Sequence, residues 1–209
     1  MRVLDAASKL FAEKGFRSTT VAAICKEAKA NIAAVNYYFG GKEDLYREAW
    51  RHAHDRTLAQ VPPDGGIAPD APAAERLRGR IRAGIQRSMF GDAIAFRIMQ
   101  KEMANPTELL HEVFHNAIEP LRRDTQAIMR DLLGPRATAK DIELCEMCVI
   151  SPLLHMRHRR HARRPKGPPS VLTESSVEEI VKHLTEYALA GIRQIRKRTE
   201  EPDGSTGRK

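Results

Sequence analysis

Apolar residues recur at spacings of three and four along most of the chain, and this periodicity sets the fold class. Val3, Leu4, Ala7, Leu10 and Phe11, for example, fall on one face of a helix over residues 2–14. No stretch alternates apolar and polar residues between turn signals, as a half-buried strand does. The sequence therefore predicts an all-α fold of about nine helices.

Four of these helices are predicted in residues 1–60. Gly15 is placed to end the first helix, and Thr19 and Asn31 are placed to cap the second and third. The third runs to about Tyr38 before Gly40 and Gly41 interrupt it, and a fourth begins at Lys42 and continues to about Gln60. Because the third helix is too short to be stable alone, other elements must hold it and its exposed face must serve some purpose.

The segment 61–73, VPPDGGIAPDAPA, holds four prolines and two glycines and has the composition of a linker. It divides the chain into a domain over 1–60 and a second over 73–198. Further helices are predicted at about 73–89, 93–104, 107–133 with a kink or break at Pro120, 138–157 and 174–197. The polar tail 199–209 is expected to be disordered.

The formal net charge of +8 favours a polyanionic partner. A run with no acidic residue, 155–170, carries six Lys/Arg, and it is either a solvated loop or a binding segment. The chain has no run of 18 apolar residues, which argues against a membrane, and its three cysteines show no disulfide pattern. These features predict a cytoplasmic protein.

Two short helices joined by a tight turn at 29–31 and braced by a preceding helix are typical of a helix-turn-helix, whose second helix enters the major groove of DNA. The hydroxyls of Thr20 and Tyr37 and the ammonium of Lys42 are groups that bind phosphates. Asn36 either reads adenine with its carboxamide or contacts phosphate or water. The full set of expected DNA contacts is Thr20, Asn31, Ile32, Ala33, Asn36, Tyr37, Tyr38 and Lys42.

The sequence of residues 2–50 resembles the DNA-binding domain of the TetR family. The segments that carry the resemblance are LFAEKGF, TTV, YYF and GKE. The chain departs from the usual pattern at Lys29-Ala30 in the turn and at Asn36. NIAAVNYYF, EMANPTELLHEVFHNAIEPL and EYALAGIR resemble the CecR-like members, with a CerR-type C-terminal domain. The resemblance implies a homodimeric regulator without catalytic activity or cofactor. It would be a repressor released from a palindromic double-stranded operator by a small-molecule effector, whose identity the sequence does not give.

The resemblance implies an effector pocket, and six apolar residues are proposed to line it. Methionines among them can adapt to irregular ligands, although a Met or Phe stripe at helical spacing is also typical of a protein core. The six residues are Ile85, Met89, Phe96, Met99, Phe114 and Met147. For the dimer interface, one seam of the last helix is proposed, and the alternative is that this seam covers the chain's own core. It consists of Val177, Ile180, Val181, Leu184, Ala188 and Ile192.

Two motifs suggest other chemistry. HEVFH, 111–115, matches the zinc-protease pattern with His111 and His115 as ligands and Glu112 as base, but it lacks an evident third ligand. Cys145 and Cys148 in CEMC could bind a metal or sense oxidants. The alternative is that they pack as small apolar side chains. The family resemblance favours no metal site, and the zinc site and the metal- or redox-sensing cysteine pair are the alternatives.

Overall fold

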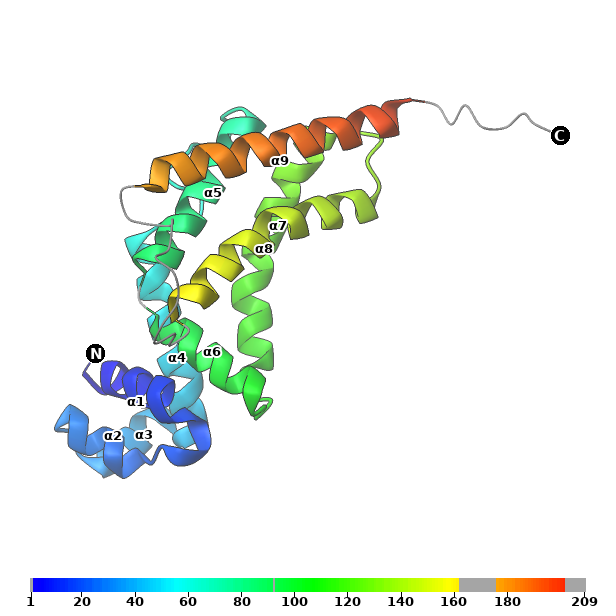
Figure 1. Ribbon diagram of the computed structural model, residues 1–209. Helices are drawn as coiled ribbons and strands as arrows, with labels where there is room; N and C mark the ends of the chain where they lie inside the picture. The colour runs from blue at the N-terminus through cyan, green and yellow to red at the C-terminus, as the bar shows by residue number, and fades with distance from the viewer. Residues whose placement is uncertain (1, 92, 162–175, 202–209) are drawn as a thin grey trace. The chain divides into compact units, whose positions relative to one another are not determined.

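The structure is a computed structural model that describes residues 2–91, 93–161 and 176–201, and most of these residues are helical. In these residues there are nine helices and no strand (Figure 1), which confirms the all-α prediction. The bounds are α1 Arg2–Ser18, α2 Val21–Ala28, α3 Ile32–Phe39, α4 Lys42–Gln60, α5 Ala73–Met89, α6 Ile94–Ala104, α7 His111–Leu133, α8 Ala139–His161 and α9 Val177–Glu200. Within these ranges, none of the helices combines the length and apolarity needed to cross a bilayer.

Some helix boundaries differ from the prediction for local reasons. α7 begins at His111 rather than near 107, because the Thr107 backbone N–H and hydroxyl both donate to Glu102 Oε1, at 2.7 and 2.6 Å. Pro120 lies inside α7 without ending it. The basic segment lies mostly outside the described residues at 162–175, as does most of the predicted disordered tail at 202–209.

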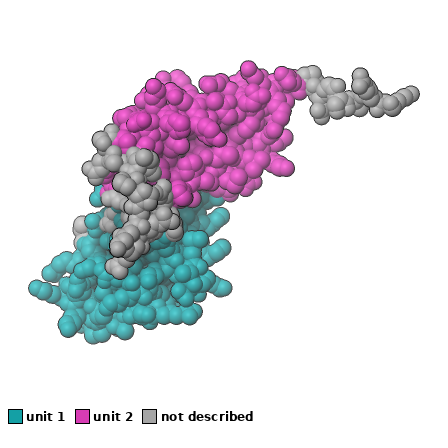
Figure 2. Space-filling model, viewed as in Figure 1, with its two compact units in different colours: residues 1–60, 91–119 teal, residues 61–90, 120–209 magenta. Residues whose placement is uncertain are grey.

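The helices group into two compact units (Figure 2). The first unit comprises residues 1–60 and 91–119, and the second comprises 61–90 and 120–209. Residues 91–119 follow the predicted linker in the sequence, yet they belong to the same unit as the N-terminal helices. α7 contributes 111–119 to the first unit and 120–133 to the second.

Trp50 of α4 is central to the packing of the first unit. Its ring is buried and meets Phe114 of α7 edge-to-face, with 4.9 Å between ring centroids. The indole N–H donates to the Ala95 carbonyl of α6 at 3.2 Å. One side chain therefore ties α4 to α6 and to the start of α7, which explains why residues 91–119 belong to this unit.

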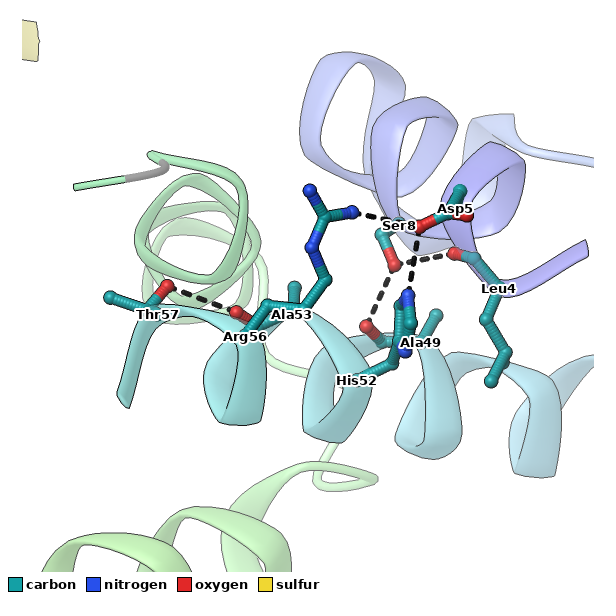
Figure 3. Close-up of polar contacts among 8 residues, drawn as sticks. All are labelled: Leu4, Asp5, Ser8, Ala49, His52, Ala53, Arg56 and Thr57. Atoms are coloured by element: carbon teal, nitrogen blue, oxygen red, sulfur yellow. Dashed lines mark hydrogen bonds and ion pairs between the residues drawn. The ribbon is translucent and has the colours of Figure 1, made fainter. Parts of the chain in front are cut away.

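Polar contacts fix α1 on α4 (Figure 3). The Ser8 hydroxyl lies 2.8 Å from the Ala49 carbonyl, and Asp5 Oδ1 lies 2.8 Å from both His52 Nε2 and Arg56 Nη1. The hydrogen bond with His52, aided by the charge of Arg56, holds the pKa of the Asp5 carboxyl below its ordinary value. This contact therefore contributes stability above the ordinary carboxyl pKa, and the contribution is lost as the pH falls through the lowered value.

The cap of α2 lies one residue later than predicted. Thr20 is the N-cap, and its hydroxyl oxygen accepts from the Ala23 N–H at 3.1 Å. Thr19 is buried instead, and its hydroxyl donates toward the Gly15 carbonyl at 2.8 Å. Gly15 adopts φ 78° within α1, a conformation that glycine reaches without strain and that turns the chain toward α2.

The segment 61–72, predicted as a linker, forms a loop fixed on α5. Arg87 Nη1 donates to the Val61 carbonyl and Arg76 Nε to the Ala71 carbonyl, each at 3.0 Å. Between these anchors the backbones of Gly65 and Gly79 come so close that a Cβ on Gly65 would lie 2.5 Å from the Gly79 carbonyl oxygen. Composition alone indicates a break in helix here, but the close backbone contact makes the loop part of the second unit.

In the second unit α5 packs against both α8 and α9. The predicted dimer seam of α9 lies against this core. Val181 and Ile192 are buried within the single chain, and the other four members are partly buried against the same core. The contact of this seam with a partner stays a prediction, since Val181 and Ile192 offer little exposed surface to a second chain and the other four members are only partly covered.

Candidate nucleic-acid interface

α2, the turn and α3 form a helix-turn-helix held in the core of the first unit. Ile24, Cys25 and Ala28 of α2 and Val35 of α3 are buried in that core. The turn is closed by the Ala30 N–H, which donates to the Cys25 carbonyl at 2.9 Å. Lys29 adopts the left-handed conformation with φ 51°, in which a β-carbon is crowded and which glycine adopts most readily.

The two N-caps have donors available on the outer side. Thr20 and Asn31 each use a side-chain oxygen to accept a backbone N–H, from Ala23 at 3.1 Å and from Ala33 at 2.7 Å. The Thr20 hydroxyl proton and the Asn31 amide protons are not used in these bonds. Both residues are exposed, so these donors are free to bind the phosphates that flank a groove.

α3 has a buried side and a large outer face. Val35 is buried and Phe39 packs against the same core, as the sequence predicts. Tyr37 and Tyr38 are 86% and 81% exposed, and their rings meet edge-to-face at 5.7 Å. The rest of the outer face is made by Ile32, Ala33, Ala34 and Asn36. Two neighbouring aromatic side chains this exposed are unusual on a surface without a partner.

Lys42, the first residue of α4, lies against the end of α1. Its ammonium is 4.3 Å from the centre of the Phe16 ring and 3.5 Å from the Arg17 carbonyl. Partial burial in this position lowers the pKa of Lys42. The ring and carbonyl fix the position of the charge, which stands at the N-terminus of a helix where an anion is favoured.

We expect Lys42→Ala to weaken binding to all DNA sequences alike and to lower the slope of log K against log salt by about one unit, because one phosphate contact is removed. Titrations of a labelled duplex at several salt concentrations measure both effects. Lys140→Ala, at an exposed lysine of α8, is the control and should leave the slope unchanged. An unchanged slope for Lys42→Ala would mean that this ammonium only packs on Phe16.

The candidate pocket residues fall in different parts of the chain. Phe96, Met99 and Phe114 belong to the first unit, where Phe114 packs on Trp50. Ile85, Met89 and Met147 belong to the second unit, where Ile85 is buried and Met89 is partly buried. Met147 is 54% exposed on α8, so it is not an interior residue of this chain.

The residues of the two alternative motifs do not assemble a larger cluster. His111 and His115 are exposed, and in the described part of the chain no group of three or more His, Cys, Asp or Glu side chains is arranged to hold a metal ion. Cys145 is buried in the core of the second unit, and burial raises the pKa of its thiol, whereas Cys148 is exposed. Cys25 is buried as an apolar core residue, as expected.

Two protein-family models and several curated proteins are similar in sequence to this chain. The model of the family described as "Bacterial regulatory proteins, tetR family" matches residues 3–49, and that described as "HTH-type transcriptional dual regulator CecR, C-terminal domain" matches 73–192. The chain is 32% identical over 136 residues to the HTH-type transcriptional dual regulator CecR of Shigella flexneri, covering 57% of this chain and 58% of that protein. It is 33% identical over 61 residues to the HTH-type transcriptional regulator HbdR of Aromatoleum sp., covering 29% of this chain and 27% of that protein. The chain thus spans less than two thirds of the length of these curated relatives.

A solved structure extends the likeness across both units. The TetR family transcriptional regulator PfmR from Thermus thermophilus matches with a TM-score of 0.63 at 23% identity, covering 91% of this chain and 98% of that one. At this identity the likeness establishes the fold. The family matches and the similarity to the CecR relative identify a DNA-binding transcriptional regulator rather than a zinc enzyme. The chain belongs to the TetR family of bacterial regulatory proteins and carries a C-terminal domain of the CecR type.

Proposed function

We propose that the protein is a homodimeric repressor that reads a palindromic operator with α3 and leaves it when a small-molecule effector binds the second unit. The observation that carries this proposal is the outer face of α3, where Asn36 and Tyr37 are exposed on a helix anchored by buried Val35. A short helix held on one side and exposed on the other is suited to enter a major groove. The donors of Thr20 and Asn31 and the charge of Lys42 support it by supplying phosphate contacts around the same helix.

Asn36 is the residue on this face best suited to read a base. Its carboxamide can donate to adenine N7 and accept from the N6 amine through one planar group, a pairing that discriminates by roughly 1–3 kcal/mol. Ala33 is exposed one turn earlier, and its methyl group can meet a thymine methyl. Tyr37 lies beside them with a phenol that reaches farther, toward a phosphate.

We expect Asn36→Ala to relax the sequence preference at one position of each half-site while leaving non-specific affinity almost unchanged, because the lost contact is to a base edge. Binding of the wild type and the variant to a set of singly substituted operators measures this. Lys42→Ala provides the contrast, since it should weaken all duplexes equally. A uniform loss for Asn36→Ala, with the preferred sequence unchanged, would show that this amide only positions the helix.

The dimer proposal is supported by the outer faces of α8 and α9 in the second unit. Leu144, Met147 and Leu154 are exposed on one face of α8 at helical spacing. α9 exposes Tyr187 near Gly191, around whose Cα there is open space. These two faces, which are exposed in the single chain, are suited to pack against their copies in a four-helix arrangement.

Repression and release require a change in the spacing of two α3 helices, since both must enter grooves on one face of the duplex. Transcription in vitro from a promoter that overlaps the bound sequence tests the direction of regulation. The proposal predicts that added protein lowers transcript yield. A rise in yield would instead favour activation, which the description of the Shigella relative as a dual regulator makes a specific alternative.

A further inference from the structure

The second unit contains a cavity of about 320 Å³ between the fixed loop 61–72, α5 and α7. One side of it is apolar and is made by Pro63, Ile67, Pro69, Ala127 and Ile128. Cavities of this size, largely apolar with a few polar groups, are typical of sites for small organic molecules. None of the pocket candidates proposed from the sequence lines it.

The loop that forms one wall is anchored to α5, so the cavity is preformed. Arg87 and Arg76 hold its two ends through carbonyl oxygens, and the Gly65 backbone rests against Gly79 between them. A side chain at Gly79 would collide with the Asp64 carbonyl and with Ile67, which lines the cavity. The loop can therefore lie this close to α5 only because residue 79 has no side chain. A site that is already formed loses little conformational entropy when a ligand binds.

Arg80 is the buried charged residue of the cavity. It is only 5% exposed, and its Nη2 donates to the Leu121 carbonyl at 2.5 Å. Within the described residues, its buried Nε has no hydrogen-bond partner. The nearest acid, Asp124, is 72% exposed and stands 3.9 Å away, which is beyond hydrogen-bond distance. A buried guanidinium with an unused donor is costly unless an anion completes its hydrogen bonds.

Carboxylates near Arg80 offset only part of the effect of its burial. Burial lowers the pKa of Arg80, and the charges of Asp124, Asp64 and Glu146 act in the opposite direction. Burial first, and then repulsion from Arg80 and Arg157, lowers the pKa of Arg87 to about 10. The other arginine at the cavity, Arg76, is already paired with Asp131. Arg80 is therefore the guanidinium with hydrogen-bonding capacity to spare for a ligand.

We propose that this cavity binds a small organic acid with an apolar body, whose carboxylate is bound by Arg80. As the effector site of the repressor, this assignment rests on the proposed function. Asp64 and Asp124 also border the cavity, so a monocarboxylate is favoured over a dianion such as phosphate, which both aspartates would repel. The apolar wall accommodates the hydrocarbon part of the ligand.

Calorimetric titration of the full-length protein with octanoate and with 3-phenylpropionate tests the proposal, and the uncharged 3-phenylpropionamide serves as the ligand control. We expect saturable binding of an acid and no detectable binding of the amide. Arg80→Gln should weaken binding by at least about tenfold, because a charge-assisted hydrogen bond is lost. Arg123→Gln, at an exposed arginine of α7 that does not line the cavity, should leave it unchanged.

A second variant guards against misfolding of Arg80→Gln. Ala127→Phe fills the cavity without touching the charge and should abolish acid binding, with its helical circular dichroism preserved. No saturable binding of either acid to the wild type, or equal binding to Arg80→Gln or Ala127→Phe, would overturn the assignment. DNA binding is measured separately on the same proteins. If the wild-type protein bound an acid but no DNA duplex, the proposed repressor function would be refuted, whereas the proposed acid-binding cavity would be retained.

Discussion

Replacing Trp50 by alanine is expected to lower the free energy of unfolding of the first unit by about 3–5 kcal/mol, the range for removing a large buried aromatic side chain. The change removes the edge-to-face contact with Phe114 and the indole N–H that donates to the Ala95 carbonyl. α4 would then lose its fixed contact with α6 and α7. Urea unfolding followed by circular dichroism measures the loss, since the variant removes the only tryptophan of the chain.

Trp50→Phe is the matched control. It keeps a ring against Phe114 and removes the indole donor, so the expected loss is smaller, about 1–2 kcal/mol. If Trp50→Ala cost less than about 1 kcal/mol, as surface substitutions do, the grouping of residues 91–119 with the N-terminal helices would be contradicted. Equal losses for the two variants would place the stabilisation in the hydrogen bond rather than in the ring.

Met147→Glu is expected to convert the protein to monomers and to weaken operator binding by about 100- to 10,000-fold, the gain that linking two binding modules confers. The side chain is 54% exposed in one chain and lies on the apolar face of α8. A carboxylate there costs little in a monomer, but in a dimer it would be buried without a partner charge. Light scattering gives the mass, and a labelled operator gives the affinity.

Met103→Glu makes the same chemical change at a residue of α6 that is 73% exposed in the first unit. It should leave both mass and affinity unaltered. A dimeric Met147→Glu protein with normal affinity would rule out this face of α8 as the interface. The substitution is a cleaner test than removal of α9, because α9 also supplies Val181 and Ile192 to the core of its own unit.

Local sequence signals predicted much of the first unit. Asn31 caps α3 through its side chain as expected, and the glycine pair precedes an α4 that begins at Lys42. Such features depend on neighbouring residues, so a single sequence reveals them. The cap of α2 was misplaced because Thr19 and Thr20 are equivalent by type, and only tertiary contacts make Thr19 the buried one.

The second unit was less predictable because its features depend on distant contacts. The seam of α9 has the same spacing whether it meets its own core or a partner, so periodicity could not choose between them. The close contact of Gly65 with Gly79 leaves no signal in composition. Arg80 did leave one, since it lies between Leu77 and Ile81 on the apolar side of α5, where a charge indicates a special environment.

We propose above that the protein is a dimer that reads a specific DNA sequence. The most direct test is selection of bound sequences from random double-stranded DNA by the purified full-length protein. We expect enrichment of a palindrome whose half-sites lie about 10 base pairs apart, or a multiple of this, with a position in each half-site that loses its preference in Asn36→Ala. Recovery of unenriched DNA, or of a single unpaired half-site, would contradict it.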